Sequence, residues 1–151
     1  MKRQRKEFLV SPDVQVGNAI PPSMAKGTHP LTIPRLQGRR MRVVSTDPVG
    51  VVSGQTILEF EQTNDMVSAR YRGGTILDGY LLGTFDSAGV SLRFCYVQVD
   101  LHGGVDAGSS ICTISHLKDG RLLLREEFQW LTRSGSGTNV FEEIRSTGDD
   151  V

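Results

Sequence analysis

One carboxylate stands in the sequence at a position where it is expected to be buried. The segment Arg121-Leu122-Leu123-Leu124-Arg125-Glu126-Glu127-Phe128-Gln129-Trp130 alternates in the manner of a strand with one buried face. The inward face then combines Glu126 with Leu122, Leu124, Phe128 and Trp130. Because burying a carboxylate is costly unless it is hydrogen-bonded or paired, Glu126 is a candidate for holding a ligand or for a base with a raised pKa. The alternative is a structural carboxylate that accepts hydrogen bonds from Tyr71, Tyr96 or an arginine.

Other strands are expected to add aromatic and polar side chains to the same interior. Alternation places Leu58 and Phe60 inward on one strand, and Val67, Ala69 and Tyr71 on the next. For Leu92 to Val99 we favour the register that sends Arg93 to water and turns inward Leu92, Phe94, Tyr96 and Gln98; the reverse would bury Cys95 and Val97. The aromatic residues either fill a solid core or line an apolar pocket in which tyrosine hydroxyls and Gln98 orient a ligand.

Other kinds of active site have little support. The three histidines, His29, His102 and His116, are scattered without a carboxylate or cysteine at ligand spacing, so we expect no metal and no cofactor. Gly135-Ser136-Gly137 lies where a hairpin loop is expected and lacks the strand-to-helix turn of a serine nucleophile. The pairs Gly73-Gly74 and Gly103-Gly104 also lack the following helix that a phosphate-binding loop needs.

From Met41 onward, short β-favouring runs alternate with turn residues, a pattern typical of a sandwich or barrel. The short connections make successive strands antiparallel, and closure would remove exposed sheet edges. We therefore predict an all-β protein, an eight-stranded antiparallel up-and-down barrel of lipocalin-like type with an N-terminal extension. Its strands are expected at about 41–46, 56–62, 65–72, 75–83, 90–100, 107–116, 120–132 and 138–146.

Charge divides the chain into an arm, residues 1–40, and a barrel domain, residues 41–151. The arm has 8 Lys or Arg and 2 Asp or Glu, which leaves 9 basic and 15 acidic residues in the barrel. Opposite net charges favour an arm that lies on the barrel, and the acidic barrel makes nucleic acid an unfavourable partner. The arm is either a flexible tail or a lid whose Phe8, Leu9 and Val10 close the mouth over a ligand.

Composition places the chain among globular proteins, with 38% hydrophobic and 23% charged residues and 17 glycines. No apolar run approaches the length that spans a bilayer, and the basic start is followed by too short an apolar stretch for a signal peptide. We therefore expect a cytoplasmic protein with no membrane partner. Cys95 and Cys112 are expected to be reduced core residues, although strand cysteines can also lie close together in a barrel.

Turn and core motifs in residues 41–146 resemble those of small bacterial lipocalin-like barrel proteins, which are often labelled N-acetylglutamate synthase. These motifs are Tyr71-Arg72-Gly73-Gly74-Thr75-Ile76, Phe94-Cys95-Tyr96, Asp119-Gly120-Arg121-Leu122, Phe128-Gln129-Trp130 and Glu142-Glu143-Ile144. More distantly, the architecture is similar to the lidded β-barrel cyclases of spirotetronate and spirotetramate biosynthesis. That likeness implies an intramolecular [4+2] cyclisation, which requires a dry pocket and no acid, base or metal.

Two functions follow as hypotheses. The first is binding of a small, largely apolar molecule in the cavity, with the arm as a lid and with Tyr71, Phe94, Phe128 and Trp130 against the ligand. The alternative is a cofactor-independent cyclase of a polyketide-like substrate, in which Glu126, Gln98 and Tyr96 hydrogen-bond a carbonyl or enolate. A solid-cored interaction module is a third class. Outward Leu123 and Leu131 also favour a homodimer.

Overall fold

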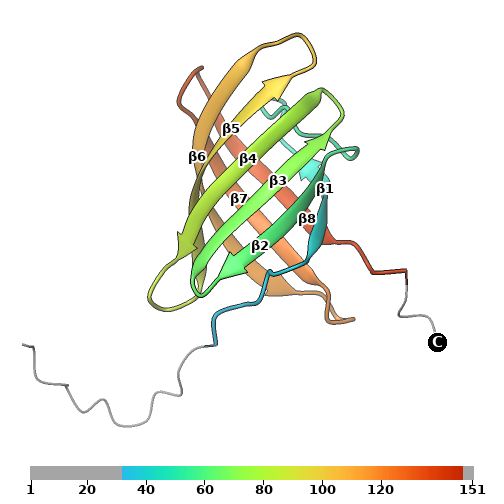
Figure 1. Ribbon diagram of the computed structural model, residues 1–151, viewed down its shortest axis with the longest axis vertical. Helices are drawn as coiled ribbons and strands as arrows, with labels where there is room; N and C mark the ends of the chain where they lie inside the picture. The colour runs from blue at the N-terminus through green and yellow to red at the C-terminus, as the bar shows by residue number, and fades with distance from the viewer. Residues whose placement is uncertain (1–31, 148–151) are drawn as a thin grey trace, which may run out of the picture.

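Eight strands close into an antiparallel barrel in the computed structural model, which describes residues 32–147 (Figure 1). Each strand pairs with its neighbours in sequence, and β8 pairs with β1, so the predicted up-and-down barrel is confirmed. The described residues include no helix with the length and apolarity needed to cross a membrane. The strands are β1 (Arg40–Thr46), β2 (Ile57–Thr63), β3 (Met66–Gly73), β4 (Ile76–Phe85), β5 (Ser91–Asp100), β6 (Val105–His116), β7 (Leu122–Trp130) and β8 (Ser136–Glu143).

Several strand ends differ from the predicted boundaries. Strand β6 begins two residues before the predicted position, because Val105 pairs with Val99 directly after the turn. Strand β8 includes Ser136 and Gly137, which the sequence indicates as part of a loop, because Ser136 pairs with Gln129. Backbone pairing thus continues into residues that favour turns, because hydrogen bonding to the neighbouring strand outweighs their local conformational preference.

One end of the barrel is closed by the residues that lead into β1. Leu36 is fully buried, and its backbone N–H donates to the Gln62 side-chain oxygen at 2.7 Å. Next to it, the Phe60 N–H donates to the Arg39 carbonyl at 3.0 Å and Gly38 donates to the Phe60 carbonyl at 2.9 Å. Residues 36–39, which the sequence places in the arm, therefore belong structurally to this closed end.

The opposite end is crossed by the connection between β1 and β2, residues 47–56, which we call the strap. Strand β1 pairs with β2 only from Arg40 to Arg42 but continues beside β8 to Thr46. The strap is then fixed at both sides, because Trp130 Nε1 donates to the Val49 carbonyl at 2.9 Å and Thr75 Oγ1 donates to the Val51 carbonyl at 3.3 Å. These bonds hold it across the barrel from the β7–β8 turn to the β3–β4 turn.

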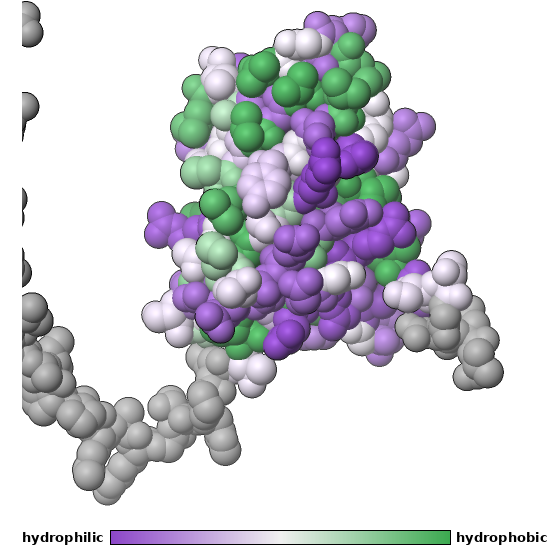
Figure 2. All heavy atoms as spheres, in the orientation of Figure 1, coloured by the Kyte–Doolittle hydropathy of each residue, from purple (hydrophilic) through white to green (hydrophobic). Residues whose placement is uncertain are grey.

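The outer surface is divided between an apolar and a charged side. Apolar residues gather on the outward face of β4, β5 and β6, where Tyr80 pairs with Val97 and Leu82 with Cys95, and Ile111 lies beside Arg93. In Figure 2 hydrophobic residues cover much of the upper and left parts of the barrel, and hydrophilic residues gather at the lower right. Ion pairs on the charged side include Arg39 with Glu143 and Arg42 with Glu142.

Two tyrosines lie flat against glycines of neighbouring strands inside the barrel. Tyr71 is opposite Gly79 and Tyr96 is opposite Gly108. A Cβ added at Gly79 would overlap the Tyr71 ring, and one at Gly108 would overlap the Tyr96 hydroxyl. Each glycine thus makes the room in which its tyrosine takes up its orientation.

Replacing Gly79 is expected to displace Tyr71. We expect Gly79→Ala to lower the free energy of unfolding by about 2 kcal/mol, because a packed interior cannot absorb the extra methyl group. Urea unfolding followed by circular dichroism measures this change. Gly54→Ala is the control, since its added Cβ would meet only the Val43 carbonyl at 3.8 Å. Equal stability of the two variants would contradict the close approach.

Candidate functional site

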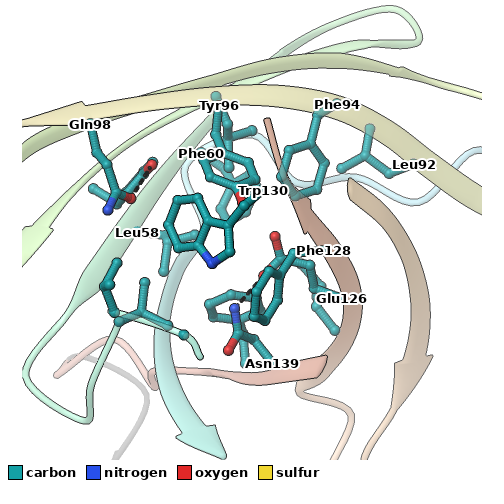
Figure 3. A pocket seen from close by; sticks show the side chains of 17 residues that line it. Leu58, Phe60, Leu92, Phe94, Tyr96, Gln98, Glu126, Phe128, Trp130 and Asn139 are labelled. Atoms are coloured by element: carbon teal, nitrogen blue, oxygen red, sulfur yellow. Dashed lines mark hydrogen bonds between the residues drawn. The ribbon is translucent and has the colours of Figure 1, made fainter. Parts of the chain in front are cut away.

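The barrel encloses a cavity beneath the strap (Figure 3). Its volume is about 40 Å³, which is room for more than one water molecule. A larger ligand therefore requires side chains or the strap to move. The lining is mostly aliphatic and aromatic and consists of Gly50, Val51, Val52, Leu58, Phe60, Tyr71, Leu81, Leu92, Phe94, Tyr96, Gln98, Leu124, Glu126, Phe128, Trp130, Asn139 and Phe141.

Aromatic rings from β5 and β7 form one wall of the cavity. The Trp130 ring lies between Tyr96 and Phe128, with centroid distances of 5.6 Å and 5.9 Å. The two pairs have interplanar angles of 75° and 71°, which is the edge-to-face arrangement that aromatic quadrupoles favour. Phe94 continues the wall at 6.4 Å from Tyr96. Because the rings of Tyr96, Trp130 and Phe128 are each nearly perpendicular to the next, together they do not form a flat wall.

Glu126 reaches the same cavity and has two neutral hydrogen-bond donors. Asn139, directly opposite it on β8, donates from Nδ2 to Oε2 at 2.8 Å. Ser110 on β6 donates from Oγ to Oε1 at 2.6 Å. Burial, with 5% of the residue exposed, raises the pKa of Glu126, and the two hydrogen bonds oppose that rise.

A second polar pair joins β3 and β5. The Tyr71 hydroxyl donates to Gln98 Oε1 at 3.0 Å. Burial raises the pKa of Tyr71 and of Tyr96, and the negative charge on Glu126 raises both further. Both hydroxyls therefore stay protonated at neutral pH and can donate as well as accept hydrogen bonds.

Two buried polar atoms near the cavity lack a hydrogen-bond partner among the described residues. They are the Tyr96 hydroxyl oxygen and Asn139 Oδ1. A buried polar atom without a partner is costly unless water or a ligand meets it. Two residues that line the cavity thus have hydrogen-bonding capacity that the described side chains do not use.

The strap end of the cavity is bordered by a charged pair. The Arg133 guanidinium lies 4.5 Å from the centre of the Trp130 ring and also forms an ion pair with Asp106. Trp130 itself is held by its hydrogen bond to the Val49 carbonyl. Opening the strap would therefore change the surroundings of this tryptophan directly.

The structure brings together the residues that alternation turns inward. The favoured register of β5 is correct, because Cys95 and Val97 are exposed. Whether these residues bind a ligand or act in catalysis stays a prediction, and Phe8, Leu9 and Val10 lie outside the described residues. The predicted site residues that line the cavity are Tyr71, Phe94, Tyr96, Gln98, Glu126, Phe128 and Trp130.

The expected partners of Glu126 are wrong. Ser110 and Asn139 donate to its carboxylate, whereas the sequence suggests Tyr71, Tyr96 or an arginine. Ser110 and Asn139 are buried on β6 and β8. A polar residue at an inward position of an alternating strand is the sequence signal that could have identified both as candidate partners. Which of several buried polar groups meet depends on the register between strands, which alternation within one strand does not reveal.

The two cysteines lie on opposite sides of the barrel wall. Cys112 is buried and Cys95 is exposed, so the expectation that both are core residues is wrong for Cys95. Both thiols are free, and burial raises the pKa of Cys112. Among the described residues no three His, Cys, Asp or Glu side chains gather in a way that would hold a metal ion.

The family of the chain follows from a comparison with known families. A family model described as avidin-like protein matches residues 34–144, which include all eight strands. The chain belongs to the avidin-like family. No curated protein and no solved structure matches it. The avidin-like barrel confirms the lipocalin-type architecture, whereas the likenesses to bacterial proteins labelled N-acetylglutamate synthase and to cyclases stay predictions.

Burial of Glu126 in this avidin-like barrel gives stability a dependence on pH. With its pKa above the ordinary value of 4.5, the folded protein holds this proton more tightly than the unfolded chain does. The stability gained from this proton is fully present below the pKa that Glu126 has in the unfolded chain. It is lost as the pH rises through the higher pKa that Glu126 has in the folded protein. We expect Glu126→Gln to weaken this loss and to be about 1 kcal/mol more stable than wild type at about pH 8.

Urea unfolding at several pH values between about 4.5 and 8 tests this expectation, because that range begins at the ordinary glutamate pKa. The Asn139 amide can turn so that its free Oδ1 accepts from the new glutamine. The matched control is Glu127→Gln, at the adjacent outward position. A wild-type stability that does not fall relative to Glu126→Gln as the pH rises would contradict the buried-carboxylate interpretation.

Proposed function

We propose that the chain binds a small, largely apolar molecule in the barrel cavity. The observation that carries the proposal is the incompletely filled interior, in which aromatic rings meet two buried polar atoms without described partners. Ligand sites typically combine mostly apolar walls with a few placed polar groups. Membership of the avidin-like family supports the same function, because barrels of this kind bind small molecules.

Two covers are relevant to ligand entry. The strap lies over the cavity through Val51 and Val52, and we propose that it moves when ligand enters. We also propose the arm as an additional lid, as expected from Phe8, Leu9 and Val10. The chain reaches β1 at the closed end, so such a lid would have to extend along the barrel to the strap. A deletion that tests it should remove residues 1–31 only, because Leu36 is part of the core.

Ligand binding is tested by Trp130 fluorescence and native mass spectrometry. The panel contains small apolar alcohols and phenols together with biotin, the ligand of another eight-stranded barrel, streptavidin. We expect binding that Phe128→Ala weakens about tenfold, because the ring's contact with ligand is lost. Gln129→Ala, at the adjacent exposed position, should bind like wild type.

The same panel separates the remaining hypotheses. Weaker retention after deletion of residues 1–31 would support the lid, and equal retention would exclude it. Turnover of a linear polyene substrate would support the [4+2] cyclase, which remains a proposal for the same cavity. Absence of binding to any form would favour an interaction module that takes no ligand. A cytoplasmic location also remains a proposal.

We further propose that two copies associate as a homodimer. Leu131 is 66% exposed and Leu123 is half-buried, but exposed apolar residues gather on the outward face of β4, β5 and β6, and we propose this face as the contact. Exposed apolar patches of this kind often mark interaction sites. Tyr80, Leu82 and Val97 are its central residues.

Light scattering coupled to size exclusion measures the assembly state. We expect a dimer for the wild type and a monomer for Leu82→Glu combined with Val97→Glu, because buried unpaired charges oppose association. Glu61→Lys, on the outward face of β2, is the control for a change in surface charge. A monomeric wild type would contradict the proposal.

A further inference from the structure

The charge inside the cavity is not balanced by the residues that surround it. Glu126 is the one carboxylate among the described lining residues, and no Lys, Arg or His is among them. Its two described donors, Ser110 and Asn139, are neutral. A carboxylate that is withdrawn from water without an opposite charge is left with a large electrostatic cost. A ligand that brings a positive charge would reduce that cost.

The carboxylate also keeps capacity for further contacts. Each of its oxygens accepts one described hydrogen bond, whereas an ionised carboxylate has about four acceptor positions. The guanidinium of Arg133, at the strap end of the cavity, lies over the Trp130 ring and pairs with Asp106. It is therefore engaged at the rim and does not neutralise Glu126.

The aromatic wall suits the same kind of ligand. The faces of aromatic rings carry negative electrostatic potential, and they attract cations most strongly where water is excluded. Tyr96, Trp130 and Phe128 all line the cavity and stand nearly perpendicular to their neighbours, and Trp130 already has the Arg133 guanidinium over its ring. Glu126, Phe128 and Trp130 alternate along the inward face of β7, which brings the charge and the rings to one surface.

We propose that the cavity recognises a small organic cation, an ammonium group bearing alkyl substituents, through Glu126 and the rings of Tyr96, Phe128 and Trp130. This inference rests on the proposed binding function and specifies its ligand class. Alkyl groups on the nitrogen match the apolar lining, and they also weaken the hydration that a cation must lose on entering. A purely neutral apolar ligand would leave the Glu126 charge unpaired, or would require its protonation.

The test compares a cation with its neutral isostere. Choline and 3,3-dimethylbutan-1-ol have nearly the same shape and differ in the charge of the central atom. Isothermal titration calorimetry and Trp130 fluorescence give their affinities for the full-length wild type, Glu126→Gln and Glu127→Gln. We expect choline to bind wild type and Glu127→Gln at least about tenfold more tightly than the isostere. Glu126→Gln should lose that preference while still binding the isostere.

Each other outcome overturns the inference in a distinguishable way. Equal or tighter binding of the neutral isostere by wild type would overturn the cation preference and leave the proposed small-molecule binding intact. A cation preference that survives in Glu126→Gln would overturn the role of the carboxylate. Failure of both compounds and of the apolar panel would overturn the ligand class and the binding function together. The wild-type comparison needs no variant, so it holds even where Glu126→Gln is unstable.

Discussion

Pairing of β8 with β1 is the constraint on which the other features of this barrel depend. Closure gives every strand two neighbours, so no strand lies at the edge of the sheet. It also divides all strand residues into an inner and an outer set, because side chains alternate across the wall. Glu126 lies at the same alternate positions of β7 as Leu124 and Phe128, so it has to be inside with them. The residues between these positions have to be outside.

Barrel closure therefore buries the carboxylate of Glu126, and neighbouring strands supply its hydrogen-bond donors. Asn139 meets it directly across the β7–β8 ladder, and Ser110 reaches it from β6. These neutral donors reduce the energetic cost of burying the carboxylate, but they do not neutralise its charge. The same interior has room beside the aromatic rings and two polar atoms with no described partner. A chain selected only for stability would be expected to fill such a space with apolar side chains.

Orientation of the inner aromatic groups depends on small residues opposite them. Gly79 and Gly108 leave space for Tyr71 and Tyr96 to lie along the wall. Tyr71 thereby reaches Gln98, and Tyr96 packs against Trp130. The strap adds a second constraint, since its carbonyl at Val49 holds the Trp130 ring by the indole N–H. The mouth and the aromatic wall of the cavity are thus coupled through a single side chain.

Local pattern determined which residues face inward. Alternation suffices for Glu126, Phe128 and Trp130, and the cost of burying Arg93 suffices to choose the register of Phe94, Tyr96 and Gln98. Turn residues likewise indicate the number and order of strands. These features depend on short stretches of chain, so they can be read without knowledge of distant residues. Only the tertiary structure decided that Ser110 and Asn139 meet Glu126, that Leu36 closes one end, and that the strap crosses the other. Those contacts join residues far apart in the chain, and their partners are selected by barrel closure and by the register between strands.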